Sequence, residues 1–244
     1  MTRRVDRTPA ERAHGTAGSQ VSRRLAGLIA RGLMRLSVRG REDLPAGGVL
    51  LAVNHASFLD GPLIFGVLPR PGTFFVKAEV FTGIPGWFLP RIGQIPVRRG
   101  VPEREPLLTA LATLAEGGIV GIFPEGTRGS GDVREVRHGI AYLALRSGCP
   151  VVPVACLGTE RVLPKGRRLP RLRQRVTVAF GAATRVTEPG TVRNRHNVAA
   201  AAERIRALLA DHVQAATAGQ AVPSPTVARI PAPDAAADPG GPDR

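Results

Sequence analysis

The sequence predicts one α/β domain built on a central mixed, partly parallel sheet that is flanked by helices. The main observation is a rhythm along the body of the chain, where short β-rich runs alternate with helix-like segments, as in sheets with helical connections. The length of 244 residues suits one sizeable domain with short appendages, and the 43% hydrophobic content is ordinary for a globular core. No run reaches the roughly 18–20 apolar residues that a membrane-spanning helix needs.

Apolar runs and helical periodicity locate the individual elements. Strands are expected at 49–53, 73–76, 94–97, 118–123, 151–156 and 176–180. The clearest helices are expected at 103–116, 139–147 and about 197–215. One face of the last helix carries the apolar stripe Val198, Ala202, Ile205, Leu209 and Val213.

The two ends of the chain differ from its body. Residues 1–20 are polar, small and charged, and we expect them to be disordered. No apolar core follows the charged residues Met1 to Arg4 closely, so we expect no cleaved secretory signal. From residue 217 onward Ala, Pro and Gly dominate, which predicts a disordered tail over 217–244. The predicted domain therefore spans 41–216, with an arm at 21–40 before it.

The arm contains a basic amphipathic helix, expected from Val21 to Leu36. At 100° per residue, one side of this helix collects Leu25, Ile29, Leu33 and Leu36. The opposite side collects Arg23, Arg24, Arg31 and Arg35.

Most of the net charge of +15 lies in two segments. Residues 1–41 hold ten arginines against two acidic residues, and residues 160–175 hold seven basic residues against one. Two basic patches on a nearly neutral body are typical of docking onto an anionic surface, either a nucleic acid or a lipid membrane. For the second patch, a solvated surface is an equally good interpretation.

A histidine and an aspartate follow the first expected strand, in the stretch VNHASFLDGP at 53–62. Reactive groups in α/β sheets collect in loops at the carboxyl ends of strands, where His55 stands. A spacing of five residues lets Asp60 accept a hydrogen bond from the imidazole, which fixes the tautomer and leaves the other ring nitrogen as a base. The alternative is structural, because Asp60-Gly61-Pro62 is also a good helix start with Asp as the N-cap.

Further polar residues follow other strand-like runs. The stretch GIVGIFPEGTR at 118–128 brings Glu125 and Arg128 to the end of a buried strand, where the arginine fork suits phosphate. The P-loop interpretation fails because no Lys-Ser or Lys-Thr pair follows. Lys77 and Arg99 add two cations near strand ends. Taken singly, Lys77 and Arg99 are better explained as solvated surface charges, and the alternative for Glu125 and Arg128 is a surface turn with a local ion pair.

Together, these motifs resemble those of the glycerolipid acyltransferase family, which includes the lysophosphatidate acyltransferases. Residues 54–60, NHASFLD, resemble the family's block of a histidine, four residues and an aspartate. Residues 77–99, ending in GQIPVRR, resemble the second block, FPEGTR at 123–128 matches the third, and VPV at 152–154 resembles the fourth. Arg98 stands where many relatives carry an acid, and the six-residue spacing from Gly93 favours Arg99 as the site residue.

The resemblance implies transfer of a fatty acyl group from acyl-CoA or acyl-ACP to the free hydroxyl of lysophosphatidate, giving phosphatidate in phospholipid synthesis. His55 would act as the base and Asp60 would orient it. Lys77, Arg99 and Arg128 would bind the phosphate of the acceptor. Glu125, with Gly126 and Thr127 beside it, would bind acceptor hydroxyls or hold the cationic side chains in place.

The same resemblance gives expectations about partners and location. The arm would lie on anionic lipids at the cytoplasmic face of the cell membrane, as a peripheral or monotopic attachment. The alternative for the arm is a helix packed on the domain with a solvated arginine face. We expect no cofactor, metal or nucleic acid; the two acyl donors would serve only as co-substrates. Cys149 and Cys156 are expected to be reduced core residues, and His138 and His212 to be structural.

Two alternative functions remain open. The acceptor could be glycerol-3-phosphate or another lysolipid, with the same chemistry. A protein of another class, a non-catalytic basic module that binds anionic lipid or nucleic acid, would explain the charge but neither of the pairs His55/Asp60 and Glu125/Arg128. The aromatic content of 4% also disfavours binding of single strands by base stacking.

Overall fold

The structure is a computed structural model that describes residues 17–98, 103–124, 138–164, 166–167, 169–187 and 191–219. These residues form an α/β domain around a seven-stranded sheet with the order β1-β7-β6-β2-β5-β3-β4. The strands are β1 (Met34–Arg39), β2 (Val49–Val53), β3 (Gly72–Lys77), β4 (Ile95–Val97), β5 (Ile119–Ile122), β6 (Val151–Leu157) and β7 (Gln174–Phe180). All neighbouring strands are parallel except β6 and β7, so the predicted mixed, mostly parallel α/β sheet is confirmed.

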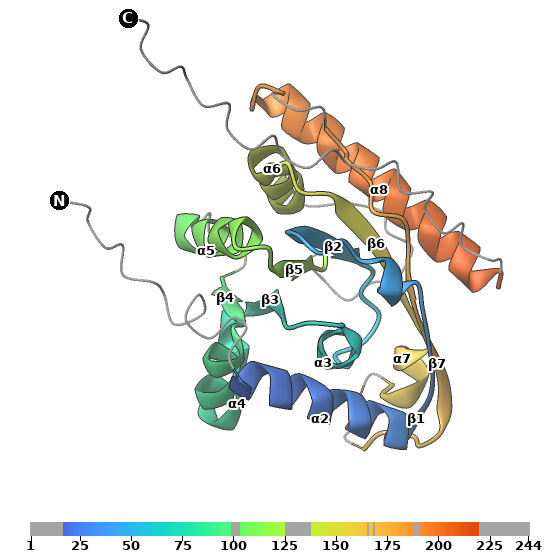
Figure 1. Ribbon diagram of the computed structural model, residues 1–244. Coiled ribbons are helices and arrows are strands. Elements are labelled where there is room, and N and C mark those ends of the chain that lie inside the picture. The colour runs from blue at the N-terminus through green and yellow to red at the C-terminus, as the bar shows by residue number, and fades with distance from the viewer. Residues whose placement is uncertain are drawn as a thin grey trace, which may run out of the picture.

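Helices cover both faces of this sheet (Figure 1). One face carries α2 (Ala17–Leu33), α3 (Asp60–Val67) and the short α7 (Thr159–Val162), and the other carries α5 (Arg104–Ala115), α6 (His138–Ser147) and α8 (Arg195–Thr217). The helix α4 (Gly83–Phe88) lies beyond β3, between the short helical turns η2 (Ala78–Val80) and η3 (Leu89–Ile92). A further turn, η1 (Arg41–Asp43), follows β1.

The side-chain alternation of β2 separates two apolar cores. Val49, Leu51 and Val53 belong to the core beneath α2 and α3, whereas Leu50 and Ala52 belong to the core beneath α5, α6 and α8. All five side chains are fully buried, because successive residues of a strand point to opposite faces and β2 is covered on both. The central position of β2 explains why its sequence is a continuous apolar run.

Five strands end at the same edge of the sheet. β2 is parallel to β6 and β5, β5 is parallel to β3, and β3 is parallel to β4, so the carboxyl ends of these five strands face one way. His55 after β2, Lys77 at the end of β3 and Arg98 after β4 therefore lie along one rim of the domain, as residues at a carboxyl edge do in α/β folds.

The amino-terminal helix differs from its prediction. The helix expected through Leu36 ends at Leu33, and Met34–Arg39 form β1, which pairs in parallel with β7. The apolar residues Met34, Leu36 and Val38 alternate with polar ones, a period-two pattern that overlaps the end of the helical stripe. Pairing with β7 gives the backbone N–H and C=O groups of this segment hydrogen-bond partners, and this favours the strand over the helix.

The face that α2 packs on the domain consists mainly of small residues. Gly27 meets Gly66 of α3 so closely that a Cβ on Gly27 would lie 2.5 Å from the carbonyl oxygen of Gly66. The predicted apolar face is therefore divided: Leu33 packs inward on the core, whereas Leu25 and Ile29 remain exposed. Arg23, expected on the solvated side, instead donates to the carbonyl oxygen of Leu68 at the end of α3.

Candidate active site

The loop after β2 begins with an asparagine that extends the sheet. Asn54 is buried, its Oδ1 accepts from the backbone N–H of Cys156 at 2.7 Å, and its Nδ2 donates to the Cys156 carbonyl at 3.1 Å. The Asn54 side chain thus forms the donor and acceptor pair of hydrogen bonds that backbone groups form between neighbouring strands. These bonds fix the point at which the chain leaves β2. His55 is thereby held just beyond the carboxyl end of the central strand.

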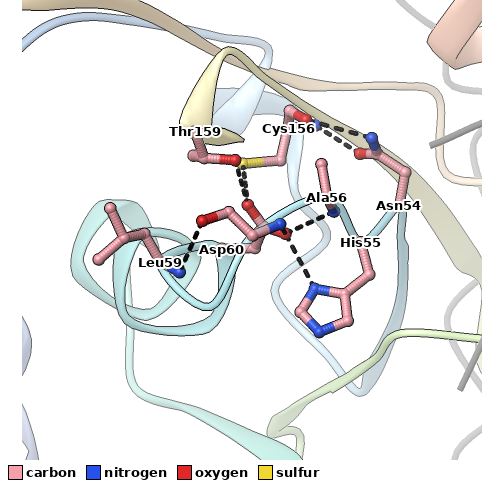
Figure 2. Close-up of polar contacts among 8 residues, drawn as sticks. Asn54, His55, Ala56, Leu59, Asp60, Cys156 and Thr159 are labelled. Carbon is pink, nitrogen blue, oxygen red and sulfur yellow. Dashed lines mark hydrogen bonds and ion pairs between the residues drawn. The ribbon is translucent and has the colours of Figure 1, made fainter. Parts of the chain in front are cut away.

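Asp60 folds back onto this loop and contacts the histidine (Figure 2). Its Oδ2 lies 2.9 Å from His55 Nδ1 and 2.8 Å from the backbone nitrogens of both Ala56 and Ser57. The contact expected from the five-residue spacing is therefore present. The Asp60 side chain is fully buried, and that of His55 is 17% exposed. A carboxylate only accepts, so His55 carries its proton on Nδ1.

The local turn explains why Asp60 points at the histidine. Asp60 is the first residue of α3 and its backbone N–H donates to the Ser57 carbonyl, while Ser57 Oγ accepts from the backbone N–H of Leu59. The residue at the N-cap position is Leu59, without a side-chain capping bond. The alternative interpretation of Asp60 as an ordinary N-cap is thus wrong, because its carboxylate binds the loop before the helix rather than the first turn.

Two further donors reach Asp60 from β6 and α7, far along the chain. Thr159 Oγ1 donates to Oδ1 of Asp60, and Cys156 Sγ lies 3.5 Å from the same oxygen. Burial is the largest cause that raises the pKa of the Cys156 thiol well above its ordinary value, and the nearby carboxylate raises it further. Cys156 therefore stays a protonated thiol that can donate to Asp60.

The other side of the histidine faces the loop after β5. The rings of His55 and Phe123 lie with their centroids 4.4 Å apart and inclined by 33°. Nε2 lies on the side of the ring away from Asp60 (Figure 2). Phe123 and Pro124 open the FPEGTR motif, so the structure brings the start of this motif to His55. Glu125, Gly126, Thr127 and Arg128 lie outside the described residues.

The cationic candidates lie on neighbouring strands of the same edge. Lys77 is the last residue of β3, and its Nζ is 3.1 Å from Glu79 Oε1. Arg98 directly follows β4, and its Nε is 2.7 Å from Glu103 Oε1. The Arg98 backbone N–H also donates to this carboxylate, and these hydrogen bonds lower the pKa of Glu103. Arg99 lies outside the described residues.

A cavity of about 520 Å³ lies at the ends of β3 and β4. Ala78, Arg98, Arg104 and Thr109 are among the residues that line it, whereas His55 and Asp60 are not. The cavity is therefore beside the histidine–aspartate pair and not around it. In the described part of the chain, no group of three or more His, Cys, Asp or Glu side chains could hold a metal ion.

The fold and the site define the class of protein to which this chain belongs. It is an α/β domain with a histidine oriented by a buried aspartate at the carboxyl edge of the sheet, an arrangement that suits general-base chemistry. The match of residues 35–157 to the family model described as Acyltransferase gives the family itself. The chain belongs to the Acyltransferase family, in agreement with the resemblance of its motifs.

Similar proteins carry the corresponding names. A 1-acyl-sn-glycerol-3-phosphate acyltransferase of Bacillus subtilis is 38% identical over 132 residues, which cover 50% of this chain and 66% of that protein. A chloroplastic protein of the same name from Brassica napus is 31% identical, with 54% of this chain and 40% of the relative covered. The chain thus spans less than two thirds of the length of these relatives.

A solved structure shares the fold. The crystal structure of the 1-acyl-sn-glycerophosphate (LPA) acyltransferase from Thermotoga maritima matches with a TM-score of 0.66 over 82% of this chain and 80% of that chain. The sequence identity of 24% makes this a likeness of fold alone.

Sequence reasoning missed three residues that position the site. Asn54 was noted only as part of its motif, and Cys156 and Thr159 were not connected with Asp60. A signal for Asn54 was available, because a buried polar residue directly after an apolar strand needs partners. No signal linked Thr159 to a carboxylate 99 positions away.

Proposed function

We propose that this protein transfers a fatty acyl group from a thioester to the free hydroxyl of lysophosphatidate and so forms phosphatidate. The observation that carries the proposal is the buried carboxylate of Asp60, which holds His55 Nδ1 at 2.9 Å with Nε2 on the far side of the ring. Membership of the Acyltransferase family and the names of the relatives support acyl transfer as the reaction.

The reaction needs a base because an alcohol is a poor nucleophile. Nε2 of neutral His55 takes the proton of the acceptor hydroxyl while its oxygen attacks the thioester carbonyl. The tetrahedral intermediate then collapses, the C–S bond breaks, and the departing thiolate receives the proton from the imidazolium. Asp60 fixes the tautomer and stabilises the transient positive charge, without an enzyme nucleophile. The products are an ester and a free thiol, and His55 returns to its neutral form.

We assign the acceptor phosphate to three cations. Lys77 ends β3, and Arg99 and Arg128 follow β4 and β5 in the sequence. Glu125, Gly126 and Thr127 belong to the same motif as Arg128 and would contact the acceptor or keep the cationic side chains in place. The donor is acyl-CoA or acyl-ACP, both of which present a thioester. We propose no metal or other cofactor for this reaction, since proton transfer and charge stabilisation suffice.

The proposed location is supported by the lipid nature of the proposed acceptor and by the exposed face of α2. A lipid acceptor requires that the site reach a bilayer, yet no described helix is both long and apolar enough to cross one. Val21, Leu25, Leu28 and Ile29 of α2 are each more than half exposed. We assign this apolar stripe to the membrane interface at the cytoplasmic face, with Arg24 and Arg31, also exposed, toward anionic headgroups.

An assay with the purified full chain tests the reaction. The protein is incubated with lysophosphatidate in vesicles and an acyl-CoA, and both thiol release and phosphatidate are measured. We expect His55→Ala to lower turnover by roughly 10²–10⁴-fold, the usual loss of a general base. His196→Ala, at an exposed position of α8, is the matched control. Near-normal turnover of a folded His55→Ala variant would overturn the mechanism.

Different acceptors separate the main proposal from its alternatives. Glycerol-3-phosphate and lysolipids with other headgroups are compared with lysophosphatidate at equal concentration. Faster turnover of another acceptor would change the substrate and leave the chemistry in place. Absence of thiol release with every acceptor and with both donors would instead favour a non-catalytic lipid-binding module.

A further inference from the structure

The second basic segment of the sequence, residues 160–175, contacts the end of the helix α2 through Arg173. The backbone N–H of Arg173 donates to the carbonyl oxygen of Leu33, the last residue of α2, at 2.6 Å. In Figure 1, α7 and the start of β7 lie beside the carboxyl-terminal end of α2, whereas α4 lies near its other end. The two basic segments that are far apart in the sequence are thus neighbours in space.

The loop of this segment exposes leucines among arginines. Leu169 is 75% exposed and Leu172 is 60% exposed, values at which a leucine contributes little to the core. Arg167 and Arg171 are exposed on the same loop, and within the described part of the chain neither forms an ion pair with an acidic residue. Exposed leucines interleaved with cations are the composition of a surface that enters a lipid interface.

Backbone contacts hold this loop in place. The N–H of Arg171 donates to the Val162 carbonyl at 2.7 Å, which ties the loop to α7. Arg173 has a φ of 56°, a left-handed conformation that is uncommon outside glycine, and its N–H makes the bond to Leu33. The backbones of Arg171 and Arg173 are therefore tied to α7 and α2.

We propose that Arg167 and residues 169–173 form a second lipid-contact site, which acts together with the exposed face of α2 on an anionic membrane. Leu169 and Leu172 enter the interface, and Arg167 and Arg171 meet the phosphates of anionic headgroups. This inference rests on the proposed membrane attachment through α2. Two neighbouring contact sites restrict the tilt of the domain on the bilayer more than a single helix does.

The composition of the loop favours lipid over nucleic acid. Residues 160–175 contain no aromatic side chain on which a base could stack. A phosphate backbone would explain the arginines but would leave two leucines exposed to water in the complex. An anionic bilayer satisfies both kinds of side chain, because its headgroups carry charge and its acyl chains lie directly beneath.

Vesicle sedimentation of the full chain tests the proposal. Partition onto phosphatidylcholine vesicles is compared with partition onto vesicles that also contain phosphatidylglycerol, at low and high salt. The charge variant Arg167→Glu/Arg171→Glu should bind the anionic vesicles at least about tenfold more weakly, since each basic residue near such a surface contributes about a factor of five. The apolar variant Leu169→Ser/Leu172→Ser should bind both kinds of vesicle more weakly.

Matched controls carry the same changes on the opposite layer of the domain. Arg146→Glu/Arg195→Glu alters two exposed arginines of α6 and α8, and Leu108→Ser/Val192→Ser alters two exposed apolar residues away from α2. These controls should bind as the unchanged protein does. Circular dichroism of all variants verifies folding, which substitutions of exposed side chains affect little.

The outcomes separate this inference from the proposed function. Unchanged partition of both loop variants would overturn the second contact site. If only the α2 variant Leu25→Ser/Leu28→Ser lost vesicle binding, α2 would be the only attachment and the second contact site would be overturned. Turnover of a soluble short-chain acceptor without vesicles should be equal in all variants; if even the unchanged protein shows none, the catalytic proposal fails while the sedimentation result still decides the docking. The second contact site would also be overturned if the protein bound duplex DNA more tightly than anionic vesicles and the charge variant abolished this binding.

Discussion

Thr159 donates a hydrogen bond to Oδ1 of Asp60, although the two residues are 99 positions apart in the chain. Both side chains are fully buried. Three donors occupy the other carboxylate oxygen, among them His55 Nδ1. Asp60 is thus held by the loop after β2 on one side and by the start of α7 on the other, which fixes the plane of its carboxylate and so the direction of the imidazole.

Replacement of Thr159 tests whether this bond positions the site. Thr159→Val removes the hydroxyl donor and leaves the shape nearly unchanged. Oδ1 of Asp60 then keeps only the weak thiol donor of Cys156, which should cost about 1–3 kcal/mol. We expect kcat to fall by about tenfold with little change in KM, because the orientation of His55 and not acceptor binding is disturbed. Thr159→Ser, which keeps the hydroxyl, should restore turnover. Equal loss in both variants would assign the residue to packing alone.

The charge of Asp60 has a separate test. Asp60→Asn keeps the shape but offers an amide that can either donate or accept, so the imidazole can adopt the wrong tautomer. We expect a fall in kcat of about 10⁴-fold, as when the aspartate of a catalytic triad is neutralised. The measurement is single-turnover thiol release with saturating acceptor. A variant with most of its activity would show that the carboxylate only stabilises the loop.

Phosphate recognition by the cations predicts selective losses. Lys77→Met should weaken turnover of lysophosphatidate more than turnover of an analogue that lacks the phosphate, since a hydrogen bond to a charged group contributes about 1.5–3 kcal/mol. Arg128→Gln should act in the same way. The comparison is kcat/KM for the two acceptors. Equal losses on both acceptors would give these residues a structural role instead.

The contact of Gly66 with α2 predicts a packing defect. A Cβ on Gly66 would lie 2.7 Å from the backbone nitrogen of Gly27, where neither backbone can yield easily. We expect Gly66→Ala to displace α2 from α3 and to destabilise the protein by about 1–3 kcal/mol. Gly61→Ala, in the first turn of the same helix with open space around its Cβ, is the matched control. Equal melting temperatures of the two variants would contradict the close packing.

His212 predicts how stability depends on pH. Its Nε2 lies 2.8 Å from the Ala179 carbonyl oxygen, and burial lowers the pKa of this histidine below its ordinary value of 6.5. The unfolded chain therefore binds a proton at a higher pH than the fold does, and stability is lost as pH falls below about 6.5. We expect His212→Gln to flatten the change in unfolding free energy between about pH 7.5 and about pH 5. An identical pH dependence in both proteins would assign the acid loss to other groups.

The sequence by itself determined six of the seven strands of the sheet and the local part of the site. The run at 49–53 was predicted with its exact bounds, because a strand covered on both faces must be apolar at every position. The contact of His55 with Asp60 was predictable because five residues of loop and helix start leave little freedom. The proposed roles of both residues, like those of Arg99 and residues 125–128 outside the described ranges, stay predictions.

The tertiary structure decided everything that depends on which surfaces meet. Helical periodicity in α2 shows which side chains share a face. It cannot show that the face with Gly27 packs against Gly66 of α3 while Leu25 stays exposed. Strand order depends on the path of the connections, so local patterns predict neither the pairing of β1 with β7 nor the contact of Arg173 with Leu33 of α2. The hydrogen bond from Thr159 to Asp60 also depends on the tertiary structure. The parallel pairing of β6 with β2 brings α7 close to the amino-terminal end of α3.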